Sequence, residues 1–210
     1  MPAPLDTLLR DARVWRAGRR APGVKGIPTG YDQLDQQLAT DGWPAAALTE
    51  ILLDQPGLGE LKLLMPALAA LSQPRHDGAH RWLMWIAPPH IPYAPALSEA
   101  GVNLARVMVV HANERMDVLW AAEQSLRSGN CAAVLCWVNQ APDKSLRRLQ
   151  LAAAQGDSFG VVFGPTRTAT QSSPAALRLM LTHSDQQRTL HILKNRGGRP
   201  ATISADFLAP

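Results

Sequence analysis

The run Leu48-Thr49-Glu50-Ile51-Leu52-Leu53, followed by Asp54-Gln55-Pro56-Gly57-Leu58-Gly59-Glu60-Leu61, indicates how this chain folds. Four of the first six residues are apolar, and the run predicts a buried strand. The next eight predict a tight turn that opens onto an apolar helix. Strand, glycine turn and helix is the setting of a P-loop, whose pattern is G-x-x-x-x-G-K-[S/T]. Aligned with that pattern, Asp54 replaces the first Gly, Gly59 is the second, Glu60 replaces the Lys and Leu61 replaces the Ser/Thr.

The chemistry of a P-loop is missing from this turn. A P-loop holds phosphate with backbone N–H groups, a Lys charge and a hydroxyl on Mg²⁺. Pro56 removes one N–H, Glu60 brings a negative charge and Leu61 cannot ligate a metal. Two like charges about 4 Å apart repel by roughly 4 kcal/mol at an effective dielectric constant of about 20. The segment is therefore either a degenerate P-loop that includes Asp54 and Gly57, or an ordinary strand–helix turn.

Composition favours one α/β domain with a sizeable core. The chain has 210 residues, 46% of them hydrophobic, which suits one domain with a short extension. We find no apolar run long enough to span a membrane and no signal-peptide core, and expect a soluble, cytoplasmic protein without a membrane partner. The two cysteines, Cys131 and Cys136, fall in one predicted strand, and their spacing predicts opposite faces.

Positive charge is concentrated at the two ends. Residues 1–25 carry six Lys or Arg and two Asp, and residues 186–200 carry four Lys or Arg and no acid. Such clusters indicate anionic partners, with nucleic acid first. The alternative is that both ends are solvated tails that aid solubility.

Strands and helices alternate along the middle of the chain. We expect a mostly parallel, twisted α/β sheet with helices on both faces, because near-continuous apolar strands alternate with helices. Residues 177–182 and 189–194 predict a C-terminal β-hairpin. Strands are predicted near 47–53, 81–87, 106–111, 131–138 and 159–164, and helices near 58–72, 93–101, 114–128 and 143–155. We divide the chain into an N-terminal helix and basic linker (1–25), a core (26–200) and a short tail (201–210).

The N-terminal segment has the spacing of a short amphipathic helix. Leu5, Leu8, Leu9 and Ala12 follow the i, i+3, i+4, i+7 pattern, and Trp15 lies close to the same stripe. A Gly/Pro/Arg linker separates this segment from the core. Its apolar stripe needs another surface to cover it, on this chain or on a neighbour.

Other parts of an ATPase are also missing. Where the strand 131–138 would carry a Mg²⁺-organising acid, the residue is Trp137, and where a general base would follow the strand 81–87, Pro88 and Pro89 stand. No cluster of metal ligands supports His76 and His80, and no serine sits in a nucleophile elbow. We therefore expect a protein that is not an enzyme and binds no cofactor or metal. Nucleotide binding without hydrolysis is the remaining alternative.

Several segments resemble the RecA-type core. These are Gly26-Ile27-Pro28-Thr29-Gly30, Thr49-Glu50-Ile51 and Lys194-Asn195-Arg196. Among RecA-like proteins, residues 54–61 are most similar to the ImuA family, which is associated with translesion DNA synthesis. SulA, the SOS inhibitor of the division protein FtsZ, is a second degenerate relative that shares the middle of the pattern. The segment 26–38 and the hairpin 177–200 favour ImuA, because typical SulA proteins lack them.

The ImuA resemblance implies an accessory role in SOS mutagenesis. The implied partners are an ImuB-type relative of Y-family polymerases, RecA, a second copy of the chain and, indirectly, an error-prone C-family polymerase. Leu5, Leu8, Leu9 and Trp15 would contact RecA or a second copy. Lys194, Arg196 and Arg199 would contact single-stranded DNA or an acidic partner. The SulA alternative implies binding to FtsZ.

Overall fold

The computed structural model describes residues 26–74, 80–184 and 187–208. They form one eight-stranded sheet with strand order β3-β2-β4-β5-β1-β6-β7-β8. Neighbouring strands from β3 to β6 are parallel, and β7 and β8 are antiparallel additions. The strands are β1 (Leu48–Leu53), β2 (Trp82–Ile86), β3 (Val107–Val110), β4 (Cys131–Trp137), β5 (Phe159–Pro165), β6 (Leu177–Ser184), β7 (Gln187–Asn195) and β8 (Ala201–Ser204).

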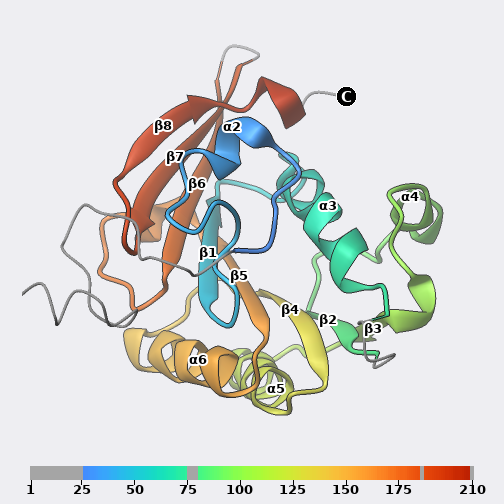
Figure 1. Cartoon of the computed structure of the whole chain (residues 1–210). Helices are drawn as coiled ribbons and strands as arrows, with labels where there is room; N and C mark the ends of the chain where they lie inside the picture. Colours follow the sequence, from blue (N-terminus) through green and yellow to red (C-terminus); the bar gives the residue numbers. More distant parts are fainter. Residues whose placement is uncertain (1–25, 75–79, 185–186, 209–210) are drawn as a thin grey trace, which may run out of the picture.

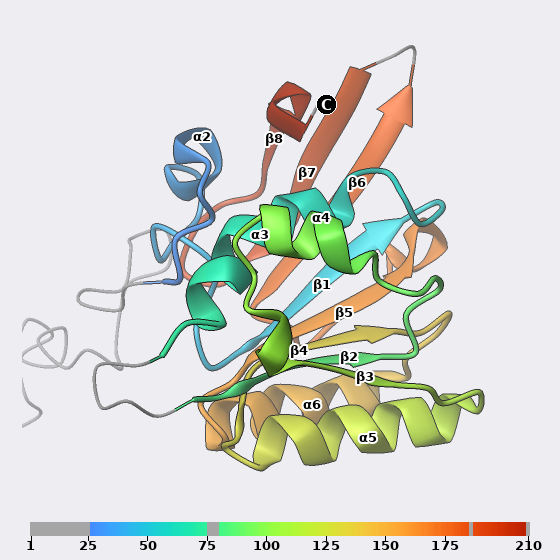
Figure 2. The same cartoon turned by 90° about the vertical axis from the view of Figure 1, so that its right-hand side faces the viewer.

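Helices cover both faces of the sheet (Figures 1 and 2). The helices are α2 (Asp32–Asp35), α3 (Glu60–Leu71), α4 (Ala94–Glu99), α5 (Arg115–Arg127) and α6 (Asp143–Gln155). Figure 2 shows α5 and α6 side by side on one face, with α3 and α4 on the other. The mixed α/β sheet, the two helical layers and the C-terminal hairpin agree with the sequence-based prediction. No helix among the described residues has the length and hydropathy needed to cross a membrane.

The central position of β1 explains why four of residues 48–53 are apolar. All six of its residues are buried, because β5 and β6 pair with its two edges and a helical layer lies on each face. Ile51 belongs to the apolar cluster under α3, and Leu48 belongs to the cluster under α5 and α6. A strand that is buried on both faces has no solvent-exposed side, so apolar and polar residues need not alternate along it.

Helix α3 contains Pro66, which cannot donate the usual N–H to the carbonyl of Lys62. The Tyr31 hydroxyl donates to that carbonyl at 2.9 Å instead. Gly30 lies against the same turn with φ +84°, and a Cβ there would lie 2.5 Å from the Pro66 Cβ. Gly30 and Tyr31 thus pack against the turn of α3 that contains Pro66 and supply the hydrogen bond that the proline cannot donate. The predicted inward residues Leu34 and Leu38 are both buried.

The prediction that the cysteines lie on opposite faces is wrong. Trp82 pairs with Cys131 and Leu83 pairs with Ala133, so β4 carries an irregularity that inserts one extra residue. A bulge of this kind changes which residues share a face. As a result, Cys131 and Cys136 both belong to the apolar cluster under α5 and α6. Burial raises the pKa of the Cys136 thiol to about 12.

Residues 201–208 lie against the core, although we expected a tail from 201 onward. Ala201–Ser204 form β8, which pairs with β7. A short 3-10 turn, Asp206–Leu208, follows and buries Leu208. The Phe207 ring packs on Tyr31 with 4.6 Å between centroids. A run of only four residues, Ala201–Ser204, is too short to identify a strand from sequence.

Candidate functional site at the carboxyl edge of the sheet

A cavity of about 330 Å³ opens where β1, β4 and β5 end. Parallel sheets bind ligands at this edge, because the loops there diverge from the strand ends. The lining comes from the loops after β1, β2, β4 and β5 and from the strand ends: Leu53, Asp54, Gln55, Pro56, Ala87, Pro89, Trp137, Val138, Asn139, Phe163, Gly164, Pro165 and Arg167. The turn that resembles a P-loop forms one wall.

The carboxylate of Glu60 folds back over this turn. The N–H of Gly57 donates to both carboxylate oxygens of Glu60, at 2.8 and 3.1 Å. Glu60 is the first residue of α3 and is only 4% exposed. Gly57 and Gly59 adopt positive φ angles of +94° and +104°, which glycine tolerates best. A helix N-terminus attracts negative charge, and here the chain supplies that charge itself.

The carboxylate of Glu60 therefore takes up an N–H that a phosphate would need. Leu61 offers no hydroxyl, as the sequence indicates. Asp54 at the other end of the turn accepts a hydrogen bond from the Thr166 hydroxyl. This contact joins the degenerate loop to the segment after β5. Within the degenerate P-loop, the structure thus shows Gly57 bonded to Glu60, and Asp54 bonded to Thr166 outside the loop.

A buried ion pair fixes the next part of the rim. Arg178 of β6 lies 3.1 Å from Glu50 of β1, between the Arg178 Nε and a Glu50 carboxylate oxygen. The same guanidinium donates to the carbonyls of Thr168, Ala169 and Gln171. Arg178 thus holds the Ser/Thr-rich segment after β5 against the sheet. Both charged residues are only 5% exposed, and buried charges need such partners.

Aromatic rings occupy the position where an ATPase would carry an acid. The Trp137 ring stacks on Phe163 with 4.5 Å between centroids and lies 5.7 Å from the Trp85 ring. Among the described residues, no cluster of three potential metal ligands occurs. Trp137 and Phe163 therefore contribute stacked aromatic rings to the lining of the cavity.

The loop between β2 and α4 presents apolar side chains to solvent. Ile91 is 87% exposed and Tyr93 is 71% exposed. The loop leaves β2 at Ala87, which has a φ of +51° and donates its N–H to the Val110 carbonyl at 2.8 Å. A non-glycine residue with this φ is uncommon and merits a functional explanation. Sequence reasoning noted the prolines here but missed the exposure of these two side chains.

The basic residues predicted at the C-terminal end are partly used within the fold. Lys194 donates to the Ser173 carbonyl at 2.5 Å, and Arg196 donates to the Pro174 carbonyl at 3.2 Å. Burial, together with the nearby Arg196 charge, lowers the pKa of Lys194. Arg199 is exposed. As partner contacts, these three residues remain a prediction. Leu5, Leu8, Leu9 and Trp15 lie outside the described residues.

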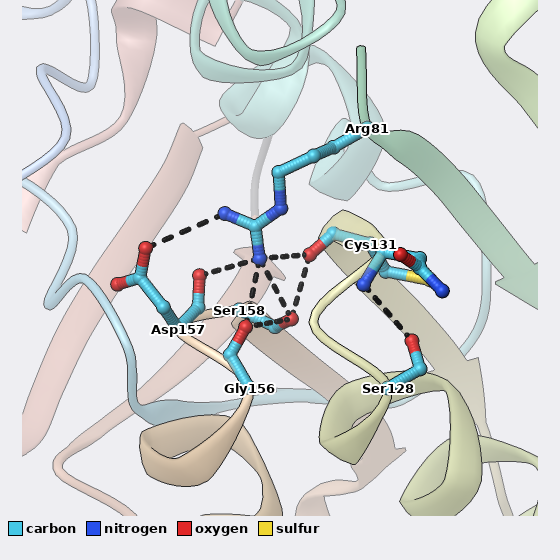
Figure 3. A network of polar contacts seen from close by, with 7 residues as sticks. Arg81, Ser128, Cys131, Gly156, Asp157 and Ser158 are labelled. Carbon is cyan, nitrogen blue, oxygen red and sulfur yellow. Dashed lines mark hydrogen bonds and ion pairs between the residues drawn. The ribbon is translucent and has the colours of Figure 1, made fainter. Parts of the chain in front are cut away.

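A second polar network, which the sequence did not reveal, lies at the amino edge of the sheet (Figure 3). One guanidinium nitrogen of Arg81 contacts the carbonyls of Cys131, Gly156 and Asp157, at 2.6, 2.8 and 2.7 Å. The Ser158 hydroxyl also donates to the Cys131 carbonyl at 2.6 Å. These bonds tie together the starts of β2, β4 and β5. Their partners are backbone carbonyls, which indicates a structural role.

Comparison with known proteins decides between the two resemblances. The family model "Cell division inhibitor SulA" matches residues 47–160, more than half of the chain. The chain belongs to the SulA family of cell division inhibitors. Its relatives include SulA of Edwardsiella piscicida, 37% identical over 50% of this chain and 60% of the relative, and SulA of Pectobacterium carotovorum, 30% identical over 55% and 65%. The chain thus matches about two thirds or less of each of these two relatives.

A solved structure gives a looser likeness. The crystal structure of SulA from Pseudomonas aeruginosa is 28% identical, covers 58% of this chain and 99% of that chain, and superposes with a TM-score of 0.46.

The identification of the chain as a member of the ImuA family is therefore wrong. The SulA match runs from the start of β1 to the start of β5, which is the part of the pattern that both families share. The segment 26–38 and the hairpin, on which the ImuA interpretation depended, lie outside the match. The implied role in translesion synthesis falls with it. So do the implied partners: the ImuB-type protein, the C-family polymerase, RecA, single-stranded DNA and a second copy of the chain.

Proposed function

We propose that this protein inhibits cell division during the SOS response by binding FtsZ, and that it acts by stoichiometric binding rather than by catalysis. The observation that carries the proposal is the SulA family match over residues 47–160. That segment contains the turn and the loop after β2 that shape the carboxyl edge. FtsZ as the partner is inferred from the family, since the match covers only part of the related chains.

The geometry of the carboxyl edge supports binding without catalysis. Glu60 satisfies the Gly57 N–H, and Trp137 lies where a metal-binding acid would be needed. We infer that the sheet descends from a RecA-type core whose nucleotide site has closed. If these loops no longer hold a nucleotide, they can serve as a protein-binding surface.

The contact surface is proposed to include Ile91 and Tyr93. Two large apolar side chains more than two thirds exposed on one short loop are costly to hydrate. Grouped apolar exposure marks interaction sites, and tyrosine is enriched among the residues that dominate binding energy. Pro89 and Pro92 restrict the loop, which reduces the entropy lost on binding.

The test measures GTP hydrolysis and sedimentable polymer of purified FtsZ while this protein is added. The expected result is loss of both activities near equimolar ratio. Ile91→Asp and Tyr93→Asp should each weaken inhibition at least tenfold. Trp120→Asp is the matched control, because Trp120 is 62% exposed on α5, which covers the opposite face of the sheet from α4 (Figure 2). Full FtsZ activity at a severalfold excess of the wild-type protein would overturn the proposed function. Loss of inhibition in Trp120→Asp alone would overturn only the assigned surface.

A further inference from the structure

A cavity of about 290 Å³ lies at the amino end of β1, at the opposite end of that strand from the proposed FtsZ surface. Apolar side chains from the segment before β1, from α6 and from the start of β6 contribute to its lining: Leu38, Pro44, Ala47, Ala154, Ala176 and Leu177. Its size is close to the lower end of the range for small-molecule sites, which are mostly apolar with a few placed polar groups. The polar groups therefore decide which ligand the cavity could take.

The polar side chains of the lining differ in how far the fold already uses them. The Thr40 hydroxyl and the Asn195 amide donate to backbone carbonyls at 2.8 and 2.9 Å. Gln150 accepts a backbone N–H of β1 through its Oε1 at 3.2 Å, which directs its amide N–H groups elsewhere. Arg196 donates to a backbone carbonyl at 3.2 Å, and this bond uses one of the five N–H groups of a guanidinium. Gln150 and Arg196 are therefore the side chains that can donate to a ligand.

The charge at this cavity is positive. Among the described residues that line it, Arg196 is charged and no Asp or Glu occurs. Burial, and then the neighbouring Arg196 charge, lowers the pKa of Lys194, so the two cations lie close enough to repel each other. An anion beside Arg196 offsets that repulsion. The cavity thus favours a negatively charged group at its rim.

Other cavities of the described chain suit an anion less well. The cavity at the carboxyl edge is lined by Asp54 as well as Arg167, and the cavity beside Arg81 is lined by Asp157. An anion in either place meets a like charge, which costs free energy. The cavity at the amino end of β1 combines an apolar wall, a cation at the rim and, among the described residues, no acid.

We propose that this cavity binds a small organic anion with an apolar body, of the size of a medium-chain carboxylate. The carboxylate accepts hydrogen bonds from Arg196, and the hydrocarbon chain lies against the leucine, proline and alanine side chains of the wall. A guanidinium suits this role because it can donate two parallel N–H bonds to one carboxylate. The site lies at the amino end of β1, so the proposal does not depend on FtsZ binding.

An NMR titration of the ¹⁵N-labelled full chain with octanoate tests the site. Arg196→Gln removes the charge, and Ala154→Trp places a large side chain in the wall of the cavity. Arg199→Gln is the control for charge, since Arg199 is exposed in the same basic loop but is not part of the lining. Gln155→Trp is the control for bulk, because Gln155 is exposed on α6 next to Ala154 and is also outside the lining.

We expect octanoate to shift the amide signals of Ala47 and Ala176, which line the cavity. Arg196→Gln should raise the dissociation constant about tenfold, because the carboxylate loses its charged donor. Ala154→Trp should abolish the shifts, and both controls should bind as the wild-type chain does. Butanoate should bind at least about tenfold less tightly than octanoate, because it buries fewer methylene groups.

Three results would overturn the proposal. The first is the absence of shifts at millimolar octanoate in the wild-type chain. The second is binding that neither Arg196→Gln nor Ala154→Trp weakens, because the anion would then bind elsewhere. The third is equal weakening in Arg196→Gln and Arg199→Gln, which would mean that octanoate responds to the general positive charge of the loop rather than to this cavity.

Discussion

Glu60 should be worth far more to stability than an ordinary acid at a helix start. The change is Glu60→Ala, which removes the buried carboxylate from the Gly57 N–H. A hydrogen bond to a charged group contributes about 1.5–3 kcal/mol, and the charge at a helix N-terminus adds about 0.3–1 kcal/mol. We expect a loss of about 3 kcal/mol in the free energy of unfolding, because both effects apply to a side chain that is only 4% exposed.

Urea unfolding, followed by circular dichroism, measures this loss. With an m-value of about 2 kcal/mol/M, the midpoint should fall by about 1.5 M. The control is Asp143→Ala, since Asp143 is also an acid in the first turn of a helix, but its exposed ion pair with Arg147 spans 3.7 Å. That control should lose less than about 1 kcal/mol. Equal losses in the two variants would refute the idea that Glu60 occupies the turn as an internal anion.

Three further outcomes follow from the described contacts. Arg178→Met should lower the free energy of unfolding by about 4 kcal/mol in urea, because Glu50 is left buried without its partner. Adding Glu50→Leu should recover the part of the loss that comes from the unpaired carboxylate, but not the bonds to the three carbonyls; no recovery would contradict the pairing. Tyr31→Phe should lower the free energy of unfolding by about 1 kcal/mol, because the Lys62 carbonyl, which Pro66 cannot bond, loses its hydrogen-bond donor. An unchanged urea midpoint would contradict this. Because burial raises the pKa of Cys136 from 9.0 to about 12, the unfolded thiol ionises first. Stability should therefore fall as pH rises above about 9, by about 1.4 kcal/mol per pH unit, with a shallower fall in Cys136→Ala.

The sheet could be predicted because its signals are local. The apolar run 48–53, the alternation of strands and helices and the hairpin each depend on neighbouring residues, and the structure has these elements close to the expected positions. The irregularity in β4 could not be predicted, because it arises from pairing with β2, far away in sequence. Strand β8 was missed for the same reason, since its partner β7 supplies most of what identifies it.

The candidate site was predicted in part. The sequence showed that Glu60 and Leu61 replace the phosphate-binding residues, but not that the Glu60 carboxylate turns back onto the Gly57 N–H. That contact depends on the three-dimensional path of the turn. The family was misjudged because the segments chosen to separate ImuA from SulA lie outside the region that the SulA model matches. The exposure of Ile91 and Tyr93 depends on which neighbours pack over a loop, and no pattern in residues 88–93 indicates it.

The central claim is that this protein inhibits division by binding FtsZ without using a nucleotide. The most direct measurement is the stoichiometry of inhibition of FtsZ GTP hydrolysis, determined with and without ATP and Mg²⁺. The account predicts that inhibition is complete near one molecule of inhibitor per FtsZ and is unchanged by ATP. Inhibition that appears only with ATP, or that is complete at a small fraction of the FtsZ concentration, would contradict it.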